Sequence, residues 1–269
     1  MKFELVIDSK STEVVIALLK EGRLIELHKE KHDNNYSVGD IYLGKVKKIV
    51  PGLNAAFVGV GHEKDGFLHY LDLGAQVKSF KKFTDKTRVK KLNTASLKNF
   101  RRDKDTLKEG KIQDVVKGGD HLMVQVSKEP ISSKGPRLST ELSFAGRYMV
   151  MIPFSDRVSI SQKIKSSEEK SRLKKLIHSI KPKGFGVIIR TVAEGKKVAE
   201  LDTDMKNLYK KWQIIFKKLK TANLNERIHG EMNRSSVILR DLLNAEFSKI
   251  HVNSPEIHSE LKEYLSRIS

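Results

Sequence analysis

Short strand-forming runs, separated by glycines and turn residues, constrain the fold of this chain more than any other feature. Runs rich in β-branched and aromatic residues that end at Gly, Pro or Asn predict β-strands. Such runs recur over about 90 residues, at 41–43, 46–50, 55–60, 67–68, 112–115 and 122–126, with Pro51-Gly52 as one of the turns. Five or so short strands in one stretch are typical of a small closed β-barrel such as an OB-fold.

The rest of the chain mixes strand and helix patterns. Strands are predicted over 3–7, 14–19, 23–28, 147–152, 186–191 and 250–252. Ser166 precedes Glu169 by three residues, as in a capping box, and apolar residues then recur at helical spacing. A longer helical face runs from Met205 to Leu219, and two more helices are predicted over 237–247 and after Ser254-Pro255. The prediction is an α+β fold with an all-β insert.

The positive charge of the chain indicates the class of its partner. The 52 Lys+Arg and 33 Asp+Glu leave a formal net charge of +19, which indicates either a polyanionic partner or only a well-solvated basic surface. Clustering favours the partner, because residues 79–104 hold ten basic residues against Asp85 and Asp103. Such a block repels itself, so we expect a loop, or a partly ordered segment, that tracks phosphates without reading sequence.

Several classes of protein are excluded by the composition. The chain has no cysteine, which excludes a disulfide framework, a Cys-ligated zinc site and a thiol nucleophile. No run approaches the roughly 18 apolar residues of a membrane-spanning helix, and no apolar core of a secretory signal follows Lys2. We expect a soluble, cytoplasmic protein without a membrane span.

Phe57 and Phe67 are the first candidates for a binding role, since both lie beside glycines in the predicted barrel. Aromatic rings exposed on a barrel face stack on unpaired bases, and each stack contributes roughly 1–3 kcal/mol. The alternative is that both rings belong to the core, where a Phe in a strand is usually found. Lys45, Lys47 and Lys128 are candidates for phosphate contacts, with a solvated face as the alternative.

Several motifs resemble the bacterial ribonuclease E/G family. The run from Ile41 to Leu68 is similar to the family pattern IYKGKVxRxxPGxxAAFVxxGxxxxGFL. Residues 124–129 resemble its VQVxKE, residues 134–140 its KGxxLT, and Arg190-Thr191 followed by Gly195 its IVRTAxxG. The matches keep their order, and the likeness spans essentially all 269 residues.

The resemblance implies a division of the chain. A ribonuclease-H-like platform would comprise residues 1–38 and 205–269. An S-one-type OB-fold barrel, an RNA-binding β-barrel that carries the basic loop 79–104, would comprise residues 39–128. A small five-prime sensor, which in the family is a pocket for a 5′-monophosphate, would comprise residues 129–204.

The resemblance also implies roles for individual residues. Phe57, Phe67 and Lys128 match the RNA-contacting positions of the barrel, and Arg190 and Thr191 match the pair that holds the terminal phosphate. A guanidinium fork beside a hydroxyl suits the oxygens of a monophosphate.

One stretch departs from the family pattern. Where the family commonly has Ser-Arg-Arg-Ile, this chain has Ser161-Gln162-Lys163-Ile164. One guanidinium is lost and another is replaced by an ammonium group, which puts an RNA contact there in doubt.

The family resemblance also bears on catalysis. In the family, Mg²⁺ held by paired aspartates in a pattern like AxxSIDVNxG supports cleavage of single-stranded RNA during RNA processing and decay, and we find no such pattern before Ser269. We therefore expect the RNA-binding, N-terminal part of an endoribonuclease, which binds RNA without cutting it and without bound Mg²⁺. A monomer or weak dimer is expected for this part, and a homo-oligomer for the full-length enzyme.

Two alternatives remain open. The chain could be a stand-alone, non-catalytic OB-fold RNA-binding protein. In a weaker alternative, Asp8 makes the platform itself a nuclease, with Glu13 or Glu26 as a companion carboxylate.

Overall fold

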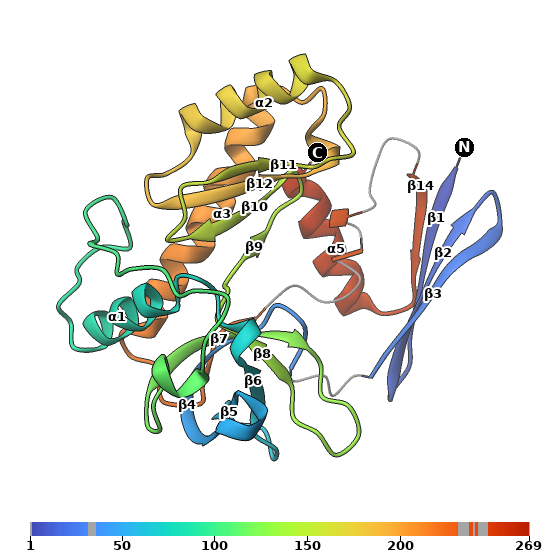
Figure 1. Cartoon of the computed structure of the whole chain (residues 1–269). Coiled ribbons are helices and arrows are strands. Elements are labelled where there is room, and N and C mark those ends of the chain that lie inside the picture. Colours follow the sequence, from blue (N-terminus) through green and yellow to red (C-terminus); the bar gives the residue numbers. More distant parts are fainter. Residues whose placement is uncertain (1, 32–35, 231–236, 239, 242–246, 269) are drawn as a thin grey trace. The chain divides into compact units, whose positions relative to one another are not determined.

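A computed structural model of the chain describes residues 2–31, 36–230, 237–238, 240–241 and 247–268 (Figure 1). Its secondary structure is mixed α+β, as predicted. The chain separates into two compact units, the first made of Met1–Asn35 with Met232–Ser269 and the second of Tyr36–Glu231. No helix in the described part of the chain is long and apolar enough to cross a membrane.

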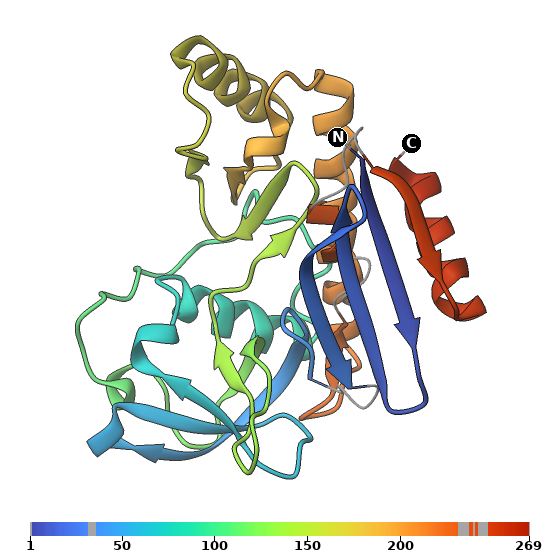
Figure 2. The same ribbon diagram turned by 90° about the vertical axis from the view of Figure 1, so that its right-hand side faces the viewer.

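The first unit is a four-stranded sheet with one helix packed on it (Figure 2). In sheet order the strands are β14 (Phe247–Val252), β1 (Phe3–Ser9), β2 (Glu13–Lys20) and β3 (Arg23–Lys31). The apolar residues that alternate along β1 and β2 form the core, and α5 (Pro255–Ile268) adds Leu261 to it. The Ser254 Oγ accepts a hydrogen bond from the Ile257 N–H at 3.3 Å, so α5 begins at the predicted cap.

A closed five-stranded barrel forms part of the second unit, which confirms the predicted OB-like architecture. Around the barrel the strands are β4 (Ile41–Val50), β5 (Ala55–Gly59), β6 (Gly66–His69), β8 (Arg137–Ser139) and β7 (His121–Lys128). Pairing of β7 with β4 closes the barrel, and the short β13 (Arg227–His229) adds to β4 outside it. In strand order this is 1-2-3-5-4, with the third and fifth strands parallel.

A second, mixed sheet packs against two helices in the same unit. The strands are β11 (Val158–Ile160), β12 (Phe185–Ile189), β10 (Met149–Pro153) and β9 (Phe144–Ala145). The helices are α2 (Ser167–Ile180) and α3 (Val198–Leu219). Ser166 caps α2 through a hydrogen bond of 3.2 Å from the Glu169 N–H, as predicted. The predicted apolar face of α3 is buried and includes Trp212, so α3 belongs to the second unit although residues 205–219 lie in the range expected for the platform.

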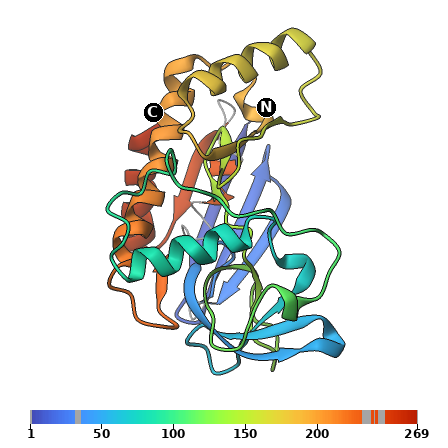
Figure 3. The ribbon, with the colours of Figure 1, turned by 60° about the vertical axis from the view of Figure 1, so that its left-hand side comes forward.

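The basic block is not a solvated loop, and the prediction for residues 79–104 is wrong in this respect. Its first half continues α1 (Val77–Arg88), a helix whose buried residues include Phe80 and Phe83. Apolar residues spaced by three give α1 one core-facing side despite its charge, and it packs against β7 and α3 (Figure 3). Beyond the helix, the Trp212 indole N–H donates to the Ala95 carbonyl oxygen at 2.8 Å, which anchors the irregular second half.

Two smaller predictions have different outcomes. The strand predicted over 112–115 is wrong, because Ile112–Asp114 form a 3₁₀ turn, η3, whose first N–H donates to Asn54 Oδ1 at 2.7 Å. The local hydrogen bonds of this turn replace those of a strand ladder. The helix predicted over 237–247 lies largely outside the described residues.

Candidate nucleic-acid interface

Four of the barrel strands bring one row of side chains into register. Phe57 on β5 is the direct partner of Phe67 on β6, Phe67 is the partner of Arg137 on β8, and Arg137 is the partner of Lys128 on β7. Lys48 on β4 extends the row, because it is the partner of Phe57. Directly paired residues project from the same face of a sheet, so two aromatic rings lie between basic groups on one outer face of the barrel.

The two phenylalanines are surface residues with partly covered rings. Both are half-buried, whereas Ala56, Val58 and Leu68 beside them are fully buried. The rings of Phe57 and Phe67 meet edge to face, with centroids 5.8 Å apart. The alternation therefore places the neighbours in the core and leaves one aromatic pair facing outward, as a stacking surface requires.

One part of the barrel surface is buried against helices, whereas the row keeps partial access to solvent. On β4, Tyr42 joins the barrel interior, while Ile41 and Leu43 are buried in a separate core with residues of α1 and α3. The strand run 41–44 is therefore buried on both sides. In contrast, Phe57, Phe67 and Arg137 in the row are only half-buried.

Of the lysines proposed from the sequence, only Lys128 belongs to the row, and Lys45 lies further along β4. Lys45 is exposed on β4, paired with Gly59, and Lys128 is exposed at the end of β7. Neither forms an ion pair with any described residue. Lys47, in contrast, is held by Asp65, with 2.8 Å between Nζ and Oδ1.

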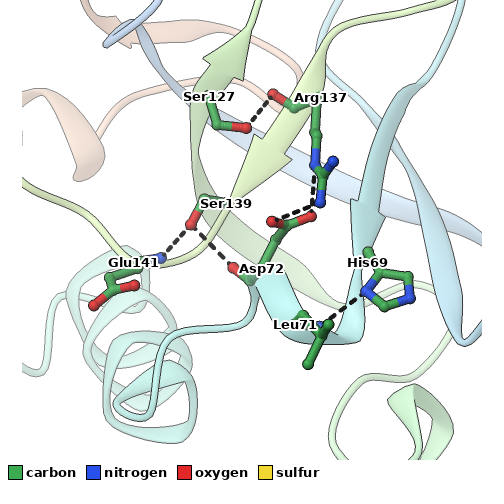
Figure 4. A network of polar contacts seen from close by, with 7 residues as sticks. All are labelled: His69, Leu71, Asp72, Ser127, Arg137, Ser139 and Glu141. Carbon is green, nitrogen blue, oxygen red and sulfur yellow. Dashed lines mark hydrogen bonds and ion pairs between the residues drawn. The ribbon is translucent and has the colours of Figure 1, made fainter. Parts of the chain in front are cut away.

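Arg137 and its partner Asp72 form a network that the sequence analysis missed (Figure 4). Nε and Nη2 of Arg137 donate to the two carboxylate oxygens of Asp72 at 2.9 and 3.2 Å. Asp72 ends the 3₁₀ turn η2 (Tyr70–Asp72), whose N-cap is His69. The only signal in the sequence is that Arg137 and Ser139 alternate with the apolar Leu138, a pattern too short to assign a partner across the barrel.

Arg190 and Thr191, the proposed phosphate pair, lie together at the end of β12 on the second sheet. The Arg190 Nη1 donates to the Gly146 carbonyl oxygen at 2.9 Å. The Thr191 Oγ1 and Ser161 Oγ share a hydrogen bond of 2.8 Å. Both residues are half-buried, so a guanidinium and a hydroxyl are held side by side with partial access to solvent.

A buried carboxylate fixes the segment that contacts Arg190. Asp204 on α3 accepts hydrogen bonds from the backbone N–H groups of Arg147 and Tyr148, at 3.1 and 2.9 Å. Burial raises the pKa of Asp204, and these backbone hydrogen bonds oppose the rise. A Cβ on Gly146 would meet the Asp204 carboxylate and displace it, so a glycine here lets Asp204 keep its backbone hydrogen bonds. The carbonyl that receives the Arg190 guanidinium is therefore well anchored.

Four cations of the basic block are engaged in contacts within the fold. Lys81 pairs with Asp120 at 2.6 Å, and Lys82 with Asp103 at 2.8 Å. Arg88 and Arg102 each donate to a backbone carbonyl, and Arg102 also pairs with Asp156. Six other basic residues of the block are exposed: Lys86, Lys90, Lys91, Lys98, Arg101 and Lys104.

The described residues do not fit a metal site. No group of three His, Asp or Glu side chains among them could hold a metal ion. The Asp8 Oδ1 accepts a hydrogen bond from Asn253 Nδ2 at 2.7 Å, and Lys10 lies 3.6 Å from its other oxygen. Asp8 therefore joins β1 to Asn253, which follows β14.

Comparison with known proteins assigns the chain to a family. The family model described as "Ribonuclease E/G family" matches residues 143–269. Ribonuclease G of Escherichia coli K12 is 33% identical over 266 residues, which cover 99% of this chain and 50% of the relative. Ribonuclease G of Haemophilus influenzae is also 33% identical, over 97% of this chain and 49% of the relative.

The likeness extends to ribonuclease E and to the barrel. Ribonuclease E of the cyanobacterium Nostoc sp. PCC 7120 is 33% identical over 95% of this chain and 33% of the relative. The chain thus spans about half the length of the ribonuclease G relatives that it matches. These alignments include the barrel strands as well as the region that the family model matches. The chain belongs to the ribonuclease E/G family.

Proposed function

We propose that this chain is the RNA-binding part of a ribonuclease E/G-type endoribonuclease, which hydrolyses single-stranded RNA in RNA processing and decay. The observation that carries the proposal is the row in which Phe57 and Phe67 face outward between Lys48 on one side and Arg137 and Lys128 on the other. The second and third strands of an OB-fold are the usual oligonucleotide face, and these strands carry the two rings.

The chemistry of the row suits a single strand and not a duplex. Unpaired bases present a face that stacks on an aromatic ring, while Lys45 and Lys128 attract the phosphates on either side. Every base has such a face, so binding of this kind carries little sequence preference. The net charge of +19 favours RNA association in general but selects no particular site.

We propose a second role for Arg190 and Thr191, as the site for a 5′-monophosphate. The guanidinium provides planar, charge-assisted donors, and the Thr191 hydroxyl adds a donor once it turns from Ser161. Burial of both groups would exclude a bulkier triphosphate more readily than a monophosphate. Gln162 and Lys163 stand where the family commonly has two arginines. The guanidinium that we assign to this phosphate site is therefore that of Arg190.

We propose RNA hydrolysis with Mg²⁺ for the whole enzyme. Phosphodiester hydrolysis with Mg²⁺ needs clustered carboxylates, and the described residues provide no such cluster. We therefore propose that residues 1–269 bind RNA but do not cut it. Mg²⁺-dependent cleavage by the purified chain would contradict this proposal.

Binding to short single-stranded RNAs tests the main proposal. Replacing Phe67 by Ala should weaken binding by roughly 1–3 kcal/mol, equally for RNAs with 5′-monophosphate and 5′-hydroxyl ends, because stacking does not involve the end group. Ile188→Ala is the matched control, since Ile188 is an apolar residue 41% exposed on β12. Unchanged affinity of the Phe67 variant would reject the barrel face as the RNA site.

The alternative function is a stand-alone RNA-binding protein that uses the same barrel face. Both functions predict the same binding results for residues 1–269. The gene sequence beyond codon 269 distinguishes them, because an endoribonuclease requires a paired-aspartate strand there and a stand-alone binding protein does not.

A further inference from the structure

Arg137 is the one member of the row whose charged group is already paired. Its side chain is 42% exposed, whereas that of its partner Asp72 is only 18% exposed. The carboxylate is therefore the more covered partner of the ion pair that Figure 4 shows. The guanidinium is the more exposed one, and Arg137 is the strand partner of Phe67. An ion pair placed only for stability would not need to lie in register with a stacking surface.

The pairing leaves part of the guanidinium available. A guanidinium carries five N–H donors, and Asp72 receives one from Nε and one from Nη2. The Nη1 of Arg137 makes no hydrogen bond with any described residue. A second acceptor with negative charge can therefore approach the outer edge of the fork without breaking the pair.

Asp72 is itself held rigidly. Its carbonyl oxygen accepts hydrogen bonds from the Ser139 Oγ and from the Thr140 N–H, both at 3.0 Å. The turn that contains it is capped by His69, whose Nδ1 accepts from the Leu71 N–H at 3.1 Å. The His69 ring also stacks on Phe67, with centroids 6.4 Å apart. The aromatic surface and the carboxylate that orients Arg137 thus belong to one connected network.

We propose that Arg137 binds a phosphate of the RNA next to the base stacked on Phe67, and that Asp72 is the positioning residue that fixes its guanidinium. This inference rests on the proposed RNA-binding function of the barrel. The planar fork offers one edge to Asp72 and the other to a phosphate oxygen, an arrangement that lysine does not reproduce. A fixed side chain loses less conformational freedom on binding, which favours affinity.

The direction in which Asp72→Asn changes the RNA affinity distinguishes a positioning role of Asp72 from a purely electrostatic one. Asp72→Asn removes a negative charge beside the RNA, so electrostatics alone would strengthen binding. If Asp72 orients Arg137, the same substitution weakens binding, by about threefold or more. Asp202→Asn is the matched control, because Asp202 pairs with Lys206 on α3, and this variant should bind RNA at least as tightly as the wild type.

Substitutions of Arg137 test whether RNA binding requires its planar guanidinium group. Binding of a fluorescent single-stranded oligoribonucleotide should weaken about tenfold for Arg137→Ala, the loss expected for one charged hydrogen bond. Arg137→Lys should weaken it nearly as much, although the charge is kept. Each variant is first shown to melt at the same temperature as the wild type. If the Asp72 variant fails to fold, Arg137→Lys alone tests the proposal.

The outcomes distinguish this inference from the proposed function. If Phe67→Ala weakens binding while the Arg137 and Asp72 variants bind like the wild type, the barrel binds RNA and the role of Arg137 is rejected. Tighter binding by Asp72→Asn also rejects the positioning role. If Phe67→Ala has no effect, the proposed function itself fails.

Discussion

Arg190 and Gly146 are joined by a hydrogen bond of 2.9 Å, in which the guanidinium Nη1 donates to the backbone carbonyl oxygen. The Arg190 N–H also donates to the Tyr148 carbonyl oxygen at 2.9 Å, and Asp204 holds the intervening segment from its other side. A backbone carbonyl oxygen therefore helps to orient the guanidinium. This arrangement limits the orientations that Arg190 can adopt and keeps it next to Thr191.

The first prediction concerns discrimination between RNA ends. Arg190→Ala should abolish any preference for a 5′-monophosphate over a 5′-hydroxyl, because the donors for the terminal phosphate are removed. Affinity for the 5′-hydroxyl RNA should not change, since that RNA uses the barrel face. The two affinities are compared by fluorescence anisotropy with RNAs that differ only at the end.

Arg157→Ala is the matched control for Arg190, because Arg157 is exposed just before β11 on the same sheet. Its removal should lower both affinities slightly and by the same factor. Equal loss of affinity for both RNAs in the Arg190 variant would instead identify Arg190 as a structural residue.

A second prediction concerns the pH dependence of stability. Hydrogen bonds from Arg172 and from the Gly195 N–H lower the pKa of Glu169 from 4.5 to about 2. A carboxyl with a lowered pKa stabilises the fold above its unfolded pKa, and this contribution is lost as the pH falls toward the folded pKa. Glu169→Gln should therefore cost about 1 kcal/mol at pH 7, and the cost should shrink between pH 4.5 and 2.

Urea unfolding at a series of pH values measures this difference. Glu168→Gln is the control, because Glu168 is exposed in the same first turn of α2, and its stability should follow the wild type. A cost for Glu169→Gln that stays constant from pH 7 to pH 3 would contradict the assigned role of the ionised carboxylate.

A third prediction compares the stability contributions of buried and exposed residues in α1 and directly after it. Phe83 is buried and contacts both Phe154 and Trp212, with ring centroids 5.6 and 5.0 Å apart. Phe83→Ala should therefore cost about 3–5 kcal/mol of stability, measured by urea unfolding. The double variant Lys86→Ala, Lys91→Ala should leave stability unchanged, since both side chains are exposed.

The same lysine variant tests whether the basic block tracks RNA. The slope of log affinity against log salt is negative, and each phosphate contact that is lost should reduce its magnitude by about 0.7 for a single strand. Lys174→Ala, Lys175→Ala on α2 is the control pair, because both residues are exposed on another helix. An unchanged slope for the Lys86→Ala, Lys91→Ala variant would restrict the RNA site to the barrel face.

Local patterns in the sequence were sufficient for much of the fold. The cap at Ser166 and the apolar face of α3 were predictable, because each depends on residues within a few positions of one another. The run 55–60 has no polar residue, so its pattern left open whether Phe57 faces the core or the solvent. The barrel strands β4, β5, β6 and β7 overlap the predicted runs, whereas β8 lies in a segment where no strand was predicted. A helix in the basic block could have been found from the spacing of Val77, Phe80 and Phe83, but the charge of the block concealed it.

The sequence by itself thus determined the longer strands, most of the helices and the family of this protein. Only the tertiary structure decided which residues share the barrel face: Arg137 meets Phe67 through a parallel pairing of strands 70 positions apart, and Asp72 reaches Arg137 over 65 positions. Register between distant strands depends on closure of the whole barrel and on the packing of α1 and α3, which no local pattern encodes. For that reason the aromatic pair was foreseeable, and the paired guanidinium beside it was not.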